Sequence, residues 1–205
     1  GYDTEGYETN SRSITARKGI KADLIRVIET PPLGLPKVPV PNHNPITVEK
    51  IELGKKLFFD RRLSLNDTFS CAMCHMAEQG YTSNELEKAV GFEGRSNRRN
   101  APTLYNTAYL ERLFLDGRET SLENQVWHPL VAENKMAMTS IGQAIEKIRG
   151  IPDYKGLFEA AFNGQQADLM TIGQAIASYE RVLVSGNSPF DRWYYAKEDK
   201  AISEE

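Results

Sequence analysis

Hydrophobic residues along the chain recur at the spacing of an α-helix rather than that of a strand. Apolar residues three and four positions apart share one helix face, whereas a strand would alternate every second residue. No stretch of the chain shows convincing strand alternation. We therefore predict an all-α protein whose helices cover residues 22–29, 48–59, 122–127, 140–149, 153–162 and 168–183.

Residues that favour helix ends mark the limits of these segments. Thr47 and Asp168 can cap the helices that follow them, because their side-chain oxygens can accept a free backbone N–H. Gly150 and Gly186 are predicted to end the helices before them. Pro129 is predicted to end the helix at 122–127, because proline cannot continue a helix.

The two ends of the chain differ from its middle. Residues 1–20 are polar and rich in Gly, Ser and Thr, which predicts a flexible leader. Six of the ten prolines lie between residues 31 and 45, which predicts an extended arm over the domain surface. We therefore divide the chain into an N-terminal arm, 1–45, and a domain, 46–205. Residues 203–205 resemble the start of a helix, so we expect the polypeptide to continue beyond them.

The composition is that of an ordinary globular protein. The chain has 205 residues, of which 40% are hydrophobic and 26% charged, with a formal net charge of −3. A charge this small gives no case for a nucleic-acid partner. No run of about 18 apolar residues occurs, so we expect no transmembrane helix.

One motif carries the clearest chemistry. Cys71, Cys74 and His75 form a Cys-x-x-Cys-His run, the attachment signature of a c-type haem, whose iron His75 would bind. The alternatives are a thioredoxin-like redox pair, which would need a βαβ pattern, and half of a zinc site. The chain has only two cysteines, and only His43 and His128 remain as further histidines. Because bacteria attach haem by thioethers outside the cytoplasm, we expect a periplasmic or cell-surface location.

Several runs together resemble one protein family. They are residues 53–60, 71–75, 99–106, 116–125, 129–130, 179–181 and 188–192. With them the chain resembles the bacterial di-haem cytochrome c peroxidase family, which includes the MauG-type enzymes. The resemblance implies a cytochrome c-like haem domain with long loops and a covalent haem c. Family members carry two haem domains, so we expect this chain to be the amino-terminal, peroxide-reacting half, with the second haem c domain beyond Glu205.

The resemblance also implies roles for residues beside the open face of the haem. The family places a glutamine, a proline and a glutamate there, and this chain has Gln125, Pro129 and Lys135. A carboxylate can accept and return a proton near neutral pH, whereas an ammonium group starts protonated and can only donate. Glu133 is the alternative acid–base group. Met136 matches the family's methionine, which supports this register.

Two further departures concern electron transfer and iron ligation. Where the family has a tryptophan between its haems, this chain has Leu115, which has no accessible redox state. The family often has an iron-binding histidine after the haem motif, but none lies between His75 and His128. His128 is therefore a candidate sixth iron ligand, a proton shuttle or a surface residue. Lys135, Met136 and Met138 are other candidate ligands, and methionine ligation would suit electron transfer.

Three residues are assigned to charged partners through the same resemblance. Arg99 and Arg118 are expected to bind the haem propionates, because a guanidinium group matches the geometry of a carboxylate. Asn100 matches the family position that binds Ca²⁺ between the two domains. Without that ion, Asn100 is an ordinary turn residue.

These features lead to one preferred function and two alternatives. We expect a periplasmic oxidoreductase that reduces hydrogen peroxide with electrons from a small cytochrome c, a copper protein or an oxidised protein substrate. Gln125, with His128 or Glu133, would supply polar groups near the peroxide. The alternatives are a six-coordinate electron-transfer cytochrome, favoured by Lys135 and Leu115, and a haem relay subunit of a larger redox complex. A homodimer is compatible with each of these functions.

Overall fold

The protein is described by a computed structural model that places residues 23–202. Within that range the chain is helical, and its sheet-like pairings are isolated bridges, such as Met76 with Thr82. The prediction of an all-α protein is confirmed. The predicted leader at 1–20 and the predicted helix start at 203–205 lie outside the described residues. No helix between residues 23 and 202 is long and apolar enough to cross a membrane.

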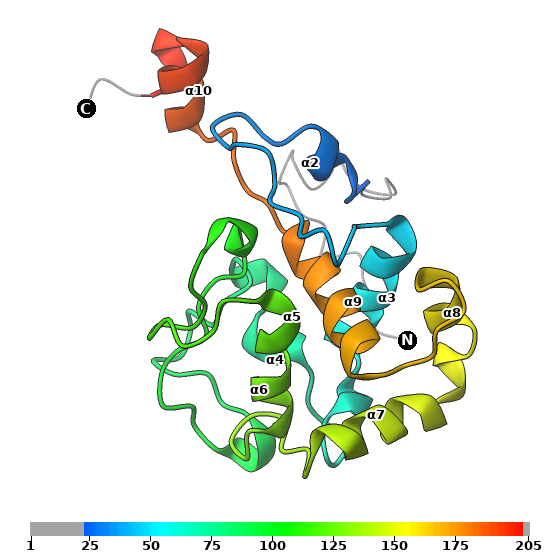
Figure 1. Ribbon diagram of the computed structural model, residues 1–205. Coiled ribbons are helices and arrows are strands. Elements are labelled where there is room, and N and C mark those ends of the chain that lie inside the picture. The colour runs from blue at the N-terminus through cyan, green and yellow to red at the C-terminus, as the bar shows by residue number, and fades with distance from the viewer. Residues whose placement is uncertain (1–22, 203–205) are drawn as a thin grey trace, which may run out of the picture.

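Two helices at the centre of the molecule carry most of the packing (Figure 1). α3 (Val48–Phe59) and α9 (Leu169–Arg181) lie against each other. Their backbones meet at Gly54, where an added Cβ would lie 1.9 Å from the carbonyl oxygen of Ala175. Because no larger residue fits there, this glycine sets the distance between the two helices.

The amino ends of both central helices are capped as the sequence predicts. The Thr47 hydroxyl accepts a hydrogen bond from the Lys50 N–H at 3.3 Å, and the Asp168 carboxylate accepts one from the Thr171 N–H at 2.7 Å. The Thr171 hydroxyl in turn accepts from the Asp168 N–H, which completes a capping box. The predicted limits of α3 are confirmed at both ends, and α9 ends two residues before its predicted limit.

The segment before α9 folds into more pieces than its pattern predicts. α7 (Ile141–Gly150) forms where it is expected. The single helix predicted over 153–162 is wrong, because the chain forms the short 3-10 helix η5 (Pro152–Tyr154) and then α8 (Leu157–Ala161). Gly156 separates these two elements with a φ of 78°, a left-handed conformation that interrupts the helix.

A proline that was expected to end a helix lies inside one. α5 (Leu122–Gln125) is followed directly by α6 (Trp127–Val131), which contains Pro129. The prediction that Pro129 ends the helical segment is therefore wrong. Pro129 occupies the first turn of α6, where its missing N–H would have had no helical acceptor in any case.

The arm before α3 is part of the interior as well as the surface. α2 (Arg26–Glu29) forms inside its predicted range, and residues 31–45 contain no helix, as predicted. Val38 and Asn44 of this arm are nevertheless buried, and Asn44 donates a hydrogen bond to Glu123 at 2.9 Å. The interpretation of the whole arm as a surface element is thus corrected. A buried amide is tolerated because its hydrogen bonds are satisfied.

The hydrophobic pattern does not predict α10 (Pro189–Ala196), which Figure 1 shows standing away from the body of the molecule. Its signals are local. Ser188 and Asp191 form a capping box, and Pro189 occupies the first helical position. Its exposed aromatic side chains are Phe190, Trp193, Tyr194 and Tyr195.

The larger hydrophobic core surrounds the cysteine motif. It joins Cys74 to buried side chains from α3, α6 and α9 and from the loop after α6, among them Leu57, Leu130, Ile176 and Met136. The motif itself forms a helical turn, α4 (Cys71–Cys74). The short 3-10 elements not yet described are η1 (Arg61–Leu63), η2 (Ala77–Gln79), η3 (Phe92–Gly94), η4 (Thr107–Tyr109) and η6 (Asp199–Ala201).

Candidate functional site

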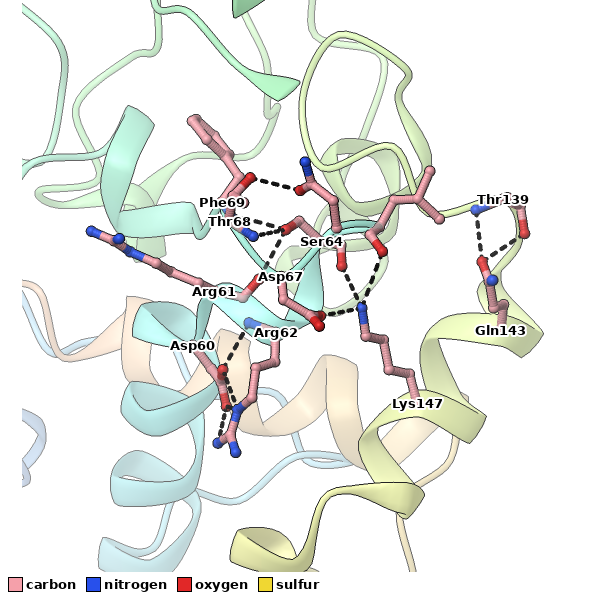
Figure 2. Close-up of polar contacts among 12 residues, drawn as sticks. Asp60, Arg61, Arg62, Ser64, Asp67, Thr68, Phe69, Thr139, Gln143 and Lys147 are labelled. Carbon is pink, nitrogen blue, oxygen red and sulfur yellow. Dashed lines mark hydrogen bonds and ion pairs between the residues drawn. The ribbon is translucent and has the colours of Figure 1, made fainter. Parts of the chain in front are cut away.

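The loop that leads into the cysteine motif is held from two sides (Figure 2). The buried Ser64 hydroxyl accepts hydrogen bonds from the N–H groups of Thr68 at 3.1 Å and Phe69 at 2.9 Å. Lys147 of α7 donates to the Ser64 carbonyl at 2.6 Å and forms an ion pair with Asp67 at 2.5 Å. These contacts give the chain a defined path into the motif.

The motif forms one helical turn that begins and ends with the two cysteines, and His75 follows as its C-cap. The Cys74 sulfur accepts from the Asn97 side-chain amide at 3.9 Å. The Cys71 sulfur lies 4.0 Å from the Met136 sulfur. A single turn thus brings two thiols and an imidazole together against the core.

His75 is oriented by the backbone. Its Nδ1 lies 3.0 Å from the carbonyl oxygen of Tyr81, a contact that fixes Nδ1 as the protonated nitrogen. Burial lowers the pKa of His75 to about 4, although the carbonyls of Tyr81 and Pro102 act in the opposite direction. The ring is therefore neutral at physiological pH, with Nε2 as its lone-pair nitrogen. A neutral imidazole oriented through its other nitrogen is the usual form of a histidine metal ligand.

The two thiols do not have the character of a redox pair. Burial raises the pKa of Cys71 to about 12, with further contributions from Glu180 and Cys74. Burial also raises the pKa of Cys74, although Lys135 acts against it. Catalytic dithiols need a lowered thiol pKa, so this environment does not favour the thioredoxin-like alternative. Among residues 23–202, no group of three or more His, Cys, Asp or Glu side chains could hold a metal ion, so a zinc site is not assembled.

Two buried polar atoms near the motif, Asn97 Oδ1 and Glu180 Oε2, have no hydrogen-bond partner among the residues that the structure describes. Asn97 contacts Cys74, and the charge of Glu180 contributes to the raised pKa of Cys71. Burial raises the pKa of Glu180 to about 8, so its carboxyl group is protonated at neutral pH. Haem c has an apolar ring and a polar edge. The apolar side chains around the motif suit the ring, and the unsatisfied polar atoms beside the thiols are available to polar groups of a bound cofactor.

A second set of side chains gathers around Phe114, and we call Phe114, Arg118, His128 and Lys135 the cation cluster. The Arg118 guanidinium lies 3.6 Å from the centre of the Phe114 ring, and the Lys135 ammonium lies 5.8 Å from it. The His128 ring packs edge-on at 5.2 Å. Phe114 has a left-handed φ of 63°, which is rare for a bulky residue. The sequence analysis did not identify Phe114 as a site residue. Its only signal in the sequence is its position two residues before the Asp-Gly-Arg run at 116–118.

Lys135 is the member of the cation cluster that reaches the cysteine motif electrostatically. Burial lowers its pKa, while Cys74 acts to raise it and Arg118 to lower it further. Its own charge helps to lower the pKa of His75. The backbone beside Lys135 packs closely against Gly91, where an added Cβ would lie 2.2 Å from the Asn134 carbonyl oxygen. Lys135 therefore lies within electrostatic range of Cys74 and His75.

The other residues predicted for the open face lie in varied environments. His128 is 46% exposed at its side chain, and its Nε2 lies 3.3 Å from the Glu119 carboxylate. Glu133 is exposed, and Gln125 is half-buried at the end of α5. Hydrogen bonding to the Thr120 backbone lowers the pKa of Glu119, with smaller contributions from Ser121 and His128. The structure thus holds His128 against Glu119 and Phe114.

The arginines predicted for the haem propionates meet on a carboxylate of the chain. Arg99 donates to Asp116 at 2.9 Å, and Arg118 donates to both oxygens of Asp116 at 2.8 Å. Asn100 uses its side chain within its own loop, where it donates to the Ser83 carbonyl and accepts from the next backbone N–H. Leu115 projects into solvent with 64% of its surface exposed.

The helical architecture and the Cys-x-x-Cys-His turn packed against the core are those of a c-type haem domain. A sequence profile described as Di-haem cytochrome c peroxidase matches residues 48–200, and the chain belongs to this family. The family name implies haem c as the cofactor of its members.

Individual relatives agree with this assignment. The chain is 40% identical over 167 residues to methylamine utilization protein MauG of Methylophilus methylotrophus, covering 82% of this chain and 49% of that protein. It is 38% identical over 161 residues to cytochrome c551 peroxidase of Pseudomonas aeruginosa, covering 77% and 45%. Among solved structures it resembles a MauG-like protein associated with microbial copper homeostasis, with a TM-score of 0.72, 30% identity, and coverage of 83% and 51%. The chain spans about half the length of these relatives.

Proposed function

We propose that the chain forms the peroxide-reacting haem domain of a periplasmic di-haem peroxidase. Cys71 and Cys74 would hold haem c through thioethers, and His75 would bind its iron through Nε2. The observation that carries this proposal is the 3.0 Å contact between His75 Nδ1 and the Tyr81 carbonyl, which orients a neutral imidazole beside the buried Cys74 thiol and the half-buried Cys71 thiol. This arrangement suits covalent haem attachment better than dithiol redox chemistry.

Haem c supplies the redox chemistry that reduces hydrogen peroxide, with two electrons and two protons, to two molecules of water. In this proposal Lys135 occupies the acid–base position. Its pKa is lowered by burial, so it can release and regain a proton closer to neutral pH than an exposed lysine can. We further propose Gln125, with His128 or Glu133, as polar groups near the bound peroxide.

The electrons come from a partner redox protein, and we propose a small cytochrome c or a copper protein as the donor. In this proposal a second haem c domain would receive them first. The half-length match to the relatives is compatible with such an arrangement.

The test is peroxide turnover by the full-length, haem-loaded protein, measured by stopped-flow absorbance. We expect Lys135→Glu to raise turnover about tenfold or more, because general acid–base catalysis contributes at least that much. Lys135→Met is the matched control, since it removes the charge without supplying a carboxylate, and it should not raise turnover. A fall in turnover for Lys135→Glu would show that this position does not carry the proton transfer.

A six-coordinate electron-transfer cytochrome is the second candidate. Lys135 in place of a carboxylate and the aliphatic, exposed Leu115 favour it. The ferric absorption spectrum separates the two functions. A high-spin spectrum that changes rapidly with peroxide supports the peroxidase, whereas a low-spin spectrum that peroxide and cyanide leave unchanged supports the electron carrier.

A further inference from the structure

A group of aromatic side chains lies on the side of the motif where His75 meets the Tyr81 carbonyl. We call Phe58, Tyr81, Tyr105 and Tyr179 the aromatic cluster. The Phe58 ring centre lies 5.3 Å from that of Tyr179, 6.3 Å from that of Tyr81 and 6.4 Å from that of His75. The rings therefore form a continuous set of contacts that starts at the imidazole.

Tyr81 connects the members of this cluster. Its φ of 56° is left-handed, which is a genuine outlier for a bulky residue. Its carbonyl faces His75 Nδ1, its ring packs edge-on against Tyr105 with centres 5.3 Å apart, and its hydroxyl lies 3.1 Å from that of Tyr179. Backbone strain of this kind persists only where the surroundings hold it, and it gathers at functional sites.

The phenols at the two ends of the cluster differ in their access to water. Tyr179 is 2% exposed, whereas Tyr105 is 36% exposed. Burial raises the pKa of Tyr179 above its usual value, so this phenol resists losing a proton. A tyrosine that gives up an electron must also release its phenolic proton to form a neutral radical. Tyr105 is the better placed of the two, because water can take that proton at the surface.

We propose that Tyr105 is a surface site at which phenolic one-electron donors are oxidised, and that the Tyr81 ring and His75 connect it electronically to the haem. This proposal rests on the proposed peroxidase function, in which hydrogen peroxide is the oxidant. Leu115, at the position of the family's tryptophan, is aliphatic and cannot hold a radical. The Phe114 ring is also much harder to oxidise than a phenol.

The transfer balances one electron at a time. Tyr105 loses one electron toward the haem through the Tyr81 ring and loses its hydroxyl proton to water, leaving a neutral tyrosyl radical. A phenol in solution then gives that radical one hydrogen atom, which restores Tyr105 and leaves a phenoxyl radical. Two such cycles supply the two electrons that reduce one hydrogen peroxide, while the two released protons balance those taken up in forming two waters.

The experiment uses the full-length, haem-loaded protein with hydrogen peroxide and 2-methoxyphenol. Freeze-quenched samples are examined by electron paramagnetic resonance, and phenol oxidation and peroxide consumption are followed separately by absorbance. We expect a tyrosyl radical that Tyr105→Phe removes, together with a fall of about tenfold or more in phenol oxidation. Tyr105→Trp should restore oxidation with a tryptophanyl signal. Tyr109→Phe is the matched control, because Tyr109 is a nearby phenol whose hydroxyl donates to the Pro36 carbonyl, and it should change neither readout.

The possible outcomes separate this proposal from the one on which it rests. If the protein consumes peroxide but Tyr105→Phe keeps the radical signal and the rate of phenol oxidation, the Tyr105 site is wrong and the peroxidase function stands. If the wild-type protein does not consume peroxide, both are wrong. Loss of both signals in Tyr105→Phe, with return of oxidation in Tyr105→Trp, establishes the site.

Discussion

The aromatic cluster and the cation cluster lie near the same cysteine turn but are built in different ways. The aromatic cluster joins α3 and α9 to the motif, and two of its members, Phe58 and Tyr179, are almost fully buried. The cation cluster is built on loops and the short helix α6, and His128 and Arg118 are largely exposed. The comparison indicates that the carbonyl of Tyr81 orients the imidazole against the helical core, while loop residues of the cation cluster influence the charge near the thiols.

The difference also has an energetic side. Aromatic rings buried between helices lose much free energy when truncated, because a cavity remains. Exposed ion pairs contribute little, because water screens them and long side chains lose entropy in pairing. The aromatic cluster should therefore resist change, whereas the cation cluster can vary among relatives without unfolding the domain.

The largest expected effect comes from breaking the aromatic cluster at its buried centre. Phe58→Ala should lower the free energy of unfolding by up to about 5 kcal/mol, because it empties a site between α3, α9 and His75. The neighbouring Phe59→Ala is the control, since Phe59 is 44% exposed and Phe58 only 1%. Urea denaturation of the haem-loaded protein measures both. Equal losses for the two variants would show that burial does not distinguish them.

A buried ion pair tests whether charged side chains can contribute as much to the free energy of unfolding as the buried aromatic rings. Arg181 donates to both oxygens of Glu123 at 2.6 and 3.0 Å, and both side chains are buried. Arg181→Met should cost about 3 kcal/mol, because it leaves the Glu123 carboxylate buried without its main partner. Thermal or urea unfolding measures this loss, and a variant as stable as the wild type would contradict it.

The same pair predicts a pH dependence. Burial acts to raise the pKa of Glu123, but hydrogen bonds from Arg181 and Asn44 outweigh it and bring the pKa down to about 2. Because the folded pKa lies below the ordinary value of 4.5, the ionised carboxylate stabilises the fold above pH 4.5. This contribution is lost as the pH falls from 4.5 toward 2, so urea midpoints should decrease over that window. Arg181→Met should show a smaller decrease, because other carboxyls with a lowered pKa, such as that of Asp60, still contribute.

A smaller effect is expected where the loops approach each other. Gly91→Ala should destabilise the fold by about 1–3 kcal/mol, because its Cβ would collide with the Asn134 carbonyl and push Lys135 away. The absorption spectrum of the ferric haem should change as well, since the charge near the motif moves. Gly150→Ala is the control for space, because no atom lies within 4 Å of its Cβ position and its backbone is not left-handed. If Gly91→Ala changed neither the stability nor the spectrum, the loop would be able to shift without moving Lys135.

The smallest effect is expected at the edge of the cation cluster. Glu119→Gln removes the partner of the exposed His128 and should change the free energy of unfolding by no more than about 1 kcal/mol. Equilibrium unfolding in low and high salt is the measurement. A loss as large as that for Phe58→Ala would erase the energetic difference between the two clusters.

Local signals in the sequence predicted much of the scaffold. Thr47 and Asp168 cap helices because the bond from a side chain to a backbone N–H three residues away needs no distant partner. The Cys-x-x-Cys-His run is equally local, and it forms the turn that the spacing requires. The two wrong helix predictions also concerned single residues and their immediate neighbours. Gly156 broke a helix that was predicted as one piece, and Pro129 was accommodated in a first turn.

The sequence by itself therefore determined the all-α class, the central helices and the haem-attachment turn, because their causes lie within a few residues along the chain. Only the tertiary structure decided that Tyr81 would orient His75, that Asn44 would be buried against Glu123, and that Phe114 would gather the cations. Those contacts join residues far apart in sequence or depend on left-handed backbone at bulky residues. No periodic pattern encodes them, since they form only when the packed helices bring the loops together.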